Sequence, residues 1–490
     1  MIRNHNTLLW MNAIAIALLA IPRESDGQET AMTHDQVSRE MHRSVGFFRK
    51  HASAGGGYIY QLSADLSKRE GEGKVASTTA WIQPPGTPAV GIAFLQAYRA
   101  CQDPMLLEAA RETAEALRQG QLESGGWDNL IEFAPEDRAR YAYRTDSGKP
   151  RKTNLRNTST FDDNKSQSAI RFLMELDKEL QFAESPLHES VMYALDSVLK
   201  SQYPNGAWPQ RFSRFPDPAA YPVIKASLPT EWPANYPAKK YSDYYTLNDN
   251  TISDLIELLL DAADIYQQPL YLEAACRGGD FLILAQLPEP QPGWSQQYDN
   301  HMHPAWARKF EPPAITGGES QRVMQTLMEL YRRTAGRIDN AKRFLKPLET
   351  AIPYYQRSQL ANGKLARFYE LHSNRPLFFT KAYELTYSSD DMPNHYSFIV
   401  DSGIDRLERE FVRIQSDPGQ GKMPLRRVTR RTSALDAKVS SVIAQLDSRG
   451  AWVEAGPLKY HGSEDDTTHV IRSQTFITHL MVLATWLGAE

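Results

Sequence analysis

Two clusters of acidic and amide side chains stand out because residues of these types could hold a metal ion. Residues 160–164 read TFDDN and residues 247–250 read LNDN. Carboxylate and amide oxygens are hard ligands of the kind that Ca²⁺ takes. A single Asp or Asn before a helix is ordinarily a capping residue. Two or three adjacent ones exceed what a cap needs, so the clusters favour a calcium site over simple helix caps.

Each cluster is followed by apolar residues at the spacing of one helix face. The first set is Ala169, Ile170, Phe172, Leu173 and Leu176, and the second is Ile252, Leu255, Ile256, Leu259 and Leu260. The sequence therefore predicts that both clusters lie at helix starts. A third polar cluster, WARKFE at residues 306–311, adds two cationic side chains and a carboxylate.

A short signal of glycine followed by a large apolar residue recurs along the chain. It appears at Gly57-Tyr58, Gly126-Trp127, Gly206-Ala207-Trp208, Gly293-Trp294, Gly363-Lys364-Leu365 and Gly450-Ala451-Trp452. Intervals of about 70 to 90 residues indicate one repeated supersecondary unit. Each unit is expected to hold two helices. One set is predicted at residues 105–119, 188–202, 271–286, 340–359 and 434–445, and the others begin near Pro88, Lys165, Thr251 and Ser320 or cover residues 470–488.

Units of two helices cannot bury their apolar faces singly, so they must pack on one another. We predict an all-α fold, a toroid (α/α barrel) of about six helical hairpins. An open solenoid with a curved face is the alternative. Long connections such as residues 212–245 are expected to form the active-site end, because structureless loops of that length are usually functional. Residues 29–490 are predicted to be a single catalytic domain.

Composition narrows the classes of function. The chain has 490 residues, of which 41% are hydrophobic and 23% charged, as in ordinary globular proteins. A formal net charge of -4 disfavours nucleic-acid binding. Basic runs at residues 149–156 and 421–431 are typical of solvated surfaces, with binding of an acidic polymer as the alternative.

Residues 1–28 are predicted to be a signal peptide. Arg3 precedes an apolar run over residues 8–21 that is too short to span a bilayer comfortably. No later stretch reaches membrane-spanning length, so we expect a secreted or periplasmic protein without further membrane contact. Cys101 and Cys276 could form a disulfide in such a protein, but two thiols within helices are the favoured interpretation.

Five motifs in order resemble polysaccharide lyase family 10, the pectate lyases. They are TFDD at 160–163, QYPNGAWPQ at 202–210, LNDN at 247–250, ARKFE at 307–311 followed by Glu319-Ser320, and ARFYE at 366–370 with NRP at 374–376. The similarity runs from about residue 40 to about residue 400. It implies a helical toroid, dependence on Ca²⁺, and cleavage of polygalacturonate by β-elimination. Two departures are Thr380-Lys381-Ala382 in place of the family's Arg-Asp-Gly and a longer connection over residues 212–245.

The resemblance also implies roles for single residues. Asp162 and Asp249 would hold calcium, with Asp163 and Asn164 completing the ligand set in an altered order. Arg308 would be the catalytic base and Arg367 a substrate-binding residue. The other substrate-binding residues we expect are Lys309, Arg375 and Trp208, the last as a ring that stacks on a sugar. A monomer is expected.

This reaction requires a base that removes a proton from the sugar. A uronate carries a weakly acidic hydrogen on C5, and its removal builds negative charge beside the sugar carboxylate. Calcium and arginine would stabilise that charge. A guanidinium is normally protonated, however, and a base needs a free lone pair. Nearby cations would favour the neutral form of Arg308. Even so, only a small fraction would be neutral at pH 7, so an alkaline pH optimum is expected.

Three other functions remain open from the residues alone. In an inverting glycoside hydrolase on a similar toroid, Asp162 and Asp249 would serve as acid and base. A non-catalytic pectin-binding protein would keep the fold without turnover. A helical scaffold would use the acids as caps. The product discriminates the two enzymes, since a lyase leaves a double bond and a hydrolase does not.

Overall fold

The computed structural model describes residues 32–149, 153–238, 241–242, 244–416 and 430–490. The predicted signal peptide, residues 1–28, and most of the basic run 421–431 lie outside these ranges. Helices dominate the described chain. The longer ones are α1 (His34–His51), α2 (Thr87–Cys101), α3 (Pro104–Gly120), α5 (Lys165–Glu179), α6 (Ser185–Lys200), α7 (Thr251–Tyr266), α8 (Pro269–Leu284), α9 (Glu319–Thr334), α10 (Leu348–Arg357), α11 (Ile404–Ser416), α12 (Ser433–Ala444) and α13 (Ser473–Leu487).

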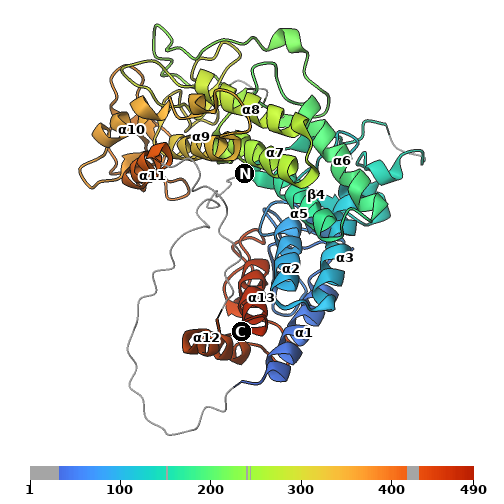
Figure 1. Cartoon of the computed structure of the whole chain (residues 1–490). Helices are drawn as coiled ribbons and strands as arrows, with labels where there is room; N and C mark the ends of the chain where they lie inside the picture. Colours follow the sequence, from blue (N-terminus) through green and yellow to red (C-terminus); the bar gives the residue numbers. More distant parts are fainter. Residues whose placement is uncertain (1–31, 150–152, 239–240, 243, 417–429) are drawn as a thin grey trace.

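The helices form two layers along a curve. One layer is a series in which each helix contacts the next, in the order α13, α2, α5, α7, α9 and α11. In the other layer, each helix packs beside a member of that series, and these helices are α12, α3, α6, α8 and α10. We call the helices of the first layer inner and those of the second outer. Figure 1 shows α11 and α13 at the two ends of the curve. The predicted all-α toroid of helical hairpins is confirmed. Within the described residues, the ring of helices does not close completely.

Most predicted helices lie where the apolar periodicity placed them. The five apolar residues predicted after each acid cluster are all buried, in α5 and α7 respectively. The segment 340–359 is different, because it divides into a 3₁₀ turn, η5 (Ala341–Phe344), and the separate helix α10. Pro347 lies between them, and proline lacks the N–H that a continuous helix would need there.

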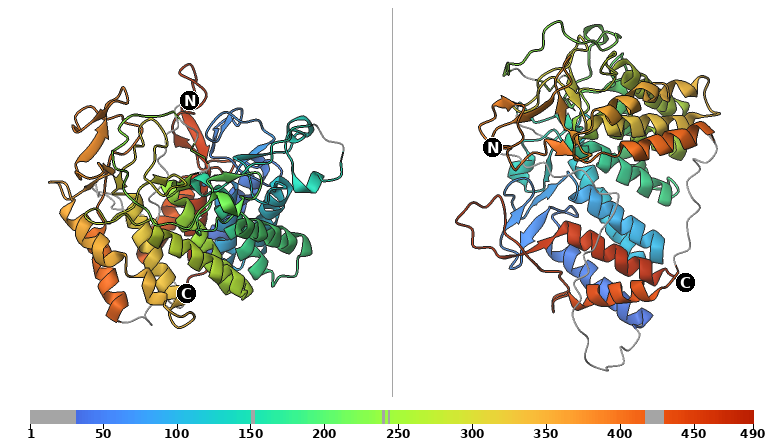
Figure 2. Two further views of the ribbon diagram at one scale, coloured as in Figure 1. Left: turned by 90° about the horizontal axis from the view of Figure 1, so that it is seen from above. Right: turned by 90° about the vertical axis from the view of Figure 1, so that its left-hand side faces the viewer.

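Short antiparallel strand pairs lie before the inner helices α5, α7 and α9. Strand β5 (Ser159–Thr160) pairs with β6 (Arg211–Phe212), β7 (Tyr245–Thr246) with β8 (Gln297–Tyr298), and β9 (Ile315–Thr316) with β11 (Phe368–Tyr369). Each pair joins the start of an inner helix to a chain segment that returns from the next outer helix. Most strands lie on one side of the helices, as the right-hand view of Figure 2 shows. The polar clusters are therefore gathered at one end of the helical array.

Further small sheets complete this end. One sheet contains β1 (Gln61–Ser63), β2 (Arg69–Glu70), β15 (Glu454–Ala455) and β16 (His469–Arg472). It joins a segment from the N-terminal part of the chain to one from the C-terminal part. Strand β3 (Thr79–Trp81) pairs with β4 (Leu130–Glu132), and β10 (Leu365–Ala366) with β14 (Ile399–Val400). Strands β12 (Pro376–Phe379) and β13 (Leu385–Thr386) extend the sheet that holds β9 and β11.

The recurring Gly-Trp signal is structural. Trp127, Trp208, Trp294 and Trp452 are buried, and the indole Nε1 of each donates to a carbonyl oxygen near the end of the preceding outer helix, at 2.8 to 2.9 Å. A fully buried ring has no free face for a ligand. The structure therefore contradicts the expectation that Trp208 stacks on a sugar.

Gly206 shows why a glycine precedes the aromatic ring. Its φ is +92°, a left-handed conformation, and a Cβ atom there would lie 2.0 Å from the carbonyl oxygen of Arg277 in α8. A residue with a side chain would be strained and would collide with backbone. The turn thus allows the next hairpin to pack closely on the one before.

Cys101 and Cys276 are free thiols, as the favoured interpretation had it. Within the described ranges, no helix combines the length and apolar character that crossing a membrane requires.

Candidate active site

The two acid clusters adopt the same backbone conformation. The first forms a 3₁₀ turn, η2 (Asp162–Asn164), before α5, and the second forms η4 (Asn248–Asn250) before α7. The φ angles are +52° and +57° at Asp163 and Asn164, and +50° and +59° at Asp249 and Asn250. Asp and Asn visit this left-handed region more readily than other residues with side chains. The clusters are thus equivalent turns, in which Asp163 corresponds to Asp249.

These turns bring three carboxylates together. One oxygen each from Asp162, Asp163 and Asp249 lies within 4.8 Å of the others. Three carboxylates at this separation repel one another, and nearby cations offset this repulsion. This carboxylate triad offers hard oxygen donors of the kind that calcium takes, so the residues present fit a divalent cation.

Two basic side chains neutralise part of the triad. The Asp162 carboxylate accepts hydrogen bonds from Arg211 Nη2 and Gln210 Nε2, both at 3.0 Å. Asp163 Oδ2 lies 3.0 Å from Lys165 Nζ, and both side chains are buried. Because Arg211 follows the motif 202–210, the first carboxylate is held by a segment that lies beyond helices α5 and α6 in the chain.

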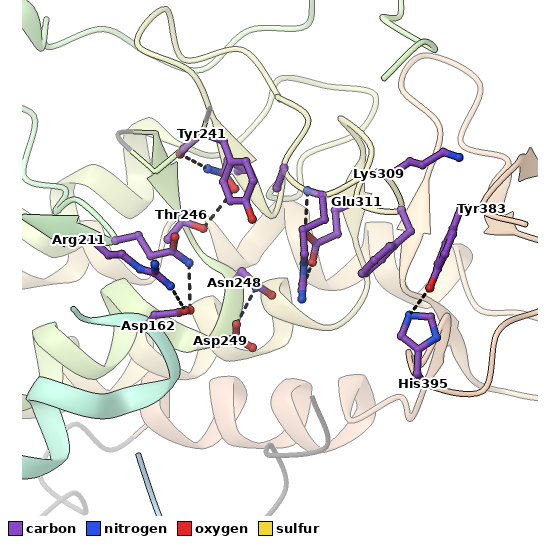
Figure 3. Close-up of a pocket in the computed structure, with 15 residues that line it drawn as sticks. Asp162, Arg211, Tyr241, Thr246, Asn248, Asp249, Lys309, Glu311, Tyr383 and His395 are labelled. Atoms are coloured by element: carbon purple, nitrogen blue, oxygen red, sulfur yellow. Dashed lines mark hydrogen bonds and ion pairs between the residues drawn. The ribbon is translucent and has the colours of Figure 1, made fainter. Parts of the chain in front are cut away.

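A cavity of about 350 Å³ opens beside the triad. Figure 3 shows Asp162 and Arg211 at one side, Glu311 in the middle and Tyr383 with His395 at the other side. The lining residues are Asp162, Gln210, Arg211, Tyr241, Thr246, Asn248, Asp249, Gln297, Ala307, Arg308, Lys309, Phe310, Glu311, Tyr383 and His395. The structure therefore unites the predicted residues Asp162, Asp249, Arg308 and Lys309 in one cavity.

Arg308 is held by Glu311 through several hydrogen bonds. The guanidinium donates from Nε to Oε2 at 2.7 Å and from Nη2 to Oε1, and the Arg308 backbone N–H donates to Oε2 at 3.0 Å. Gln296 Nε2 and the Tyr396 hydroxyl also donate to Oε1 of Glu311, at 2.9 and 3.1 Å. The carboxylate is only 2% exposed, so the pair is fixed at the base of the cavity.

This pairing determines the charge of both groups. Burial by itself lowers the pKa of Arg308, but the attraction of Glu311 outweighs it and leaves the pKa above its ordinary value. Burial would raise the pKa of Glu311, but Arg308 and the surrounding donors lower it to about 2. Arg308 is therefore a cation in this structure, and the pairing opposes the loss of its proton.

Arg367, Arg375 and Asn164 are predicted site residues that do not line the cavity. Arg367 Nη2 lies 2.6 Å from Glu319 Oε1 and its guanidinium packs over the Tyr396 ring, so it ties the β11 segment to the start of α9. Arg375 is exposed and packs over Tyr387. Asn164 precedes α5 in the turn described above.

Several cavity residues were not predicted from the sequence. Gln210 ends a motif that the sequence reveals, and Arg211 follows it. Tyr241 comes from the long connection 212–245. Tyr383 and His395 come from the region where the family's Arg-Asp-Gly is replaced, and the Tyr383 hydroxyl lies 3.2 Å from His395 Nε2. Burial and then Arg308 lower the pKa of His395, so this imidazole is neutral at pH 7.

Several solved structures have a similar course of the chain. A family 10 polysaccharide lyase from Cellvibrio cellulosa is 19% identical, with a TM-score of 0.43, over 62% of this chain and 90% of that one. A mutant of such a lyase from the same organism, in complex with trigalacturonic acid, is 18% identical, with a TM-score of 0.44, over 68% and 98%. A D-mannose isomerase is 14% identical, with a TM-score of 0.45, over 93% and 98%. None of the curated proteins matches the sequence.

The family assignment rests on the sequence match. The model of the family described as pectic acid lyase matches residues 121–396. This range is more than half of the chain, and it contains both acid clusters, Arg211, and the Arg308–Glu311 pair. The chain belongs to the pectic acid lyase family.

Proposed function

We propose that this protein is a pectate lyase that cleaves polygalacturonate by calcium-assisted β-elimination. The observation that carries the proposal is the carboxylate triad, of which Asp162 and Asp249 line the same cavity as Arg308. A negatively charged polymer needs cationic partners, and the cavity provides Arg211, Arg308 and Lys309. Family membership supports the same reaction class.

The metal proposed is Ca²⁺, with Asp162, Asp163 and Asp249 as its carboxylate ligands and Asn164 as an amide ligand. The cluster of three carboxylates fits a hard divalent cation. When bound, calcium would supply positive charge next to the substrate carboxylate, which stabilises the negative charge that develops during elimination.

The residues of the chain then have distinct tasks. Arg308, held in place by Glu311, is the proposed acceptor of the C5 proton. Because Glu311 opposes deprotonation of Arg308, the neutral base is scarce at neutral pH and the rate should rise toward alkaline pH. Arg211 and Lys309 offer positive charge to uronate carboxylates, and arginine can match a carboxylate with two parallel hydrogen bonds.

The product of the reaction tests this proposal. Polygalacturonate incubated with the protein and calcium should give an unsaturated uronate, seen as rising ultraviolet absorbance. Excess chelator should stop the reaction, and added calcium should restore it. Full activity in chelator would contradict the calcium site. New reducing ends without a double bond would instead indicate the glycoside hydrolase.

The hydrolase is the less favoured enzyme for a structural reason. An inverting hydrolase needs one carboxyl group that donates a proton to the leaving oxygen. Asp162 instead accepts hydrogen bonds on both oxygens, from Gln210 and Arg211. We also propose that the enzyme is secreted or periplasmic, because residues 1–28 have the pattern of a signal peptide. We further propose that it is a monomer.

A further inference from the structure

Tyr241 is a cavity residue to which neither the motifs nor the proposed function gives a role. Figure 3 shows its ring above the cavity, with the hydroxyl directed between the Asp162–Arg211 pair and Glu311. Its carbonyl oxygen accepts a hydrogen bond from Gln297 Nε2 at 3.0 Å. Since Gln297 belongs to β8, this bond anchors Tyr241 to the strand pair that precedes α7.

The Tyr241 phenol also feels the charges of both ion pairs. Its ionisation is influenced by Glu311 and Arg308 on one side and by Asp162 and Arg211 on the other. Burial, and next Glu311, raise the pKa of Tyr241 above its ordinary value. The hydroxyl thus keeps its proton at neutral pH, and it can donate that proton into the cavity.

The other lining hydroxyl groups are poorly placed to donate a proton near the triad. Among the lining residues that the structure describes, those with hydroxyl groups are Tyr241, Thr246 and Tyr383. Thr246 is fully buried, with its hydroxyl 3.5 Å from Gln297 Oε1. Tyr383 is engaged with His395 at the far side of the cavity (Figure 3). Arg308 and Arg211 are bound to carboxylates. The geometry leaves Tyr241 beside the triad and the proposed base.

We propose that Tyr241 donates its proton to the departing O4 oxygen during elimination, a role that rests on the proposed lyase function. As the base takes the C5 proton, the electron pair of the C5–H bond forms the C4–C5 double bond. The electron pair of the C4–O4 bond leaves with O4, which takes the Tyr241 proton. Water then returns a proton to the phenolate, and the base releases the C5 proton to solvent.

The variant Tyr241→Phe tests this role because it removes only the hydroxyl. On polygalacturonate, kcat should fall by about 100-fold or more, the usual effect of losing a general acid, while KM changes little. The matched control is Tyr244→Phe on the same connection. Tyr244 does not line the cavity, and its phenol is influenced by Asp299 rather than by the two ion pairs. This control should keep the wild-type rate.

A second substrate distinguishes proton donation from positioning. An oligogalacturonide that carries a nitrophenyl group on the 4-oxygen releases nitrophenolate, which leaves without being protonated. Tyr241→Phe should therefore lose far less activity, relative to wild type, on this substrate than on polygalacturonate. An equal loss on both substrates would show that the hydroxyl only positions the sugar, and would overturn the proposal.

The remaining outcomes separate this inference from the proposed function. A wild-type protein that makes no unsaturated product would overturn both. An active wild type together with an equally active Tyr241→Phe would overturn the role of Tyr241 alone. If the Tyr241→Phe variant does not fold, a measurement on the wild-type protein still tests the proposal. The solvent deuterium effect on kcat should be larger for polygalacturonate than for the nitrophenyl substrate, and equal effects would contradict proton donation.

Discussion

Asp249 and Asp163 are the two carboxylates of the triad that occupy equivalent positions in the two turns. Replacement of Asp249 by Asn keeps the shape and the left-handed backbone but removes one negative charge. Calcium at about 100 times its dissociation constant should stabilise the wild type by about 2.7 kcal/mol, and Asp249→Asn should lose most of this gain. Thermal unfolding with and without calcium measures the effect. Asp217→Asn, at an exposed position on the connection 212–245, is the control, and an equal shift in both variants would refute the site.

Glu311 should give stability that depends on pH. Its pKa of about 2 in the folded protein lies below the ordinary value of about 4.3. A carboxylate with a lowered pKa stabilises the fold above its ordinary pKa, and the gain of about 3 kcal/mol is lost as pH falls toward 2. The difference in unfolding free energy between wild type and Glu311→Gln should therefore shrink from about pH 6 to about pH 3. Denaturant titrations at several pH values test this, with the exposed Glu136→Gln as control. A difference that is constant with pH would contradict the pairing.

Arg308 is proposed to act in catalysis, and its shape is part of that role. Arg308→Lys keeps a positive charge but loses the planar group that holds Glu311 through two nitrogens. We expect kcat on polygalacturonate to fall by about 100-fold or more, as for loss of a general base. Steady-state kinetics together with thermal unfolding separate this from loss of folded protein. A folded variant with wild-type kcat would leave Arg308 with a structural role only.

At the scale of elements, the repeated turn after each outer helix fixes one hairpin against the next. Trp208 in this turn donates to the carbonyl oxygen of Val198 in α6. Trp208→Phe removes that hydrogen bond and leaves a small void, so it should cost about 2 to 4 kcal/mol of stability. The KM for polygalacturonate should be unchanged in the folded fraction. Trp294→Phe, the equivalent change in the next unit, should behave alike, and a raised KM with unchanged stability would restore the sugar-stacking role.

At the scale of the whole molecule, a chain of net charge -4 must bind a polyanion through local positive charge. Such attraction is screened by salt. Higher ionic strength should therefore raise KM for polygalacturonate, and de-esterified polymer should be cleaved in preference to its methyl ester, which lacks the charge that Lys309 and Arg211 attract. Initial rates on both polymers at several salt concentrations measure this. Equal rates on both would point to another pectin or to a neutral glycan.

The sequence by itself determined the repeated helical hairpins and the identity of the acid clusters. Both depend on local patterns. The spacing of Ile252, Leu255 and Ile256 fixes one helix face whatever packs against it, and Asp and Asn in adjacent positions suit the left-handed turn before α7. The Arg308–Glu311 pair is also local, since its members are three residues apart.

Only the tertiary structure decided which other side chains enter the cavity. Arg211 reaches Asp162, and Tyr241 and His395 line the same cavity, although these residues are far apart in the chain. It also placed Trp208 inside the hairpin repeat and Arg367 against Glu319. Such contacts depend on how separate hairpins stack and on how their long connections fold back over the helix starts. No periodicity along the sequence carries that information, because each contact joins segments whose local patterns are independent.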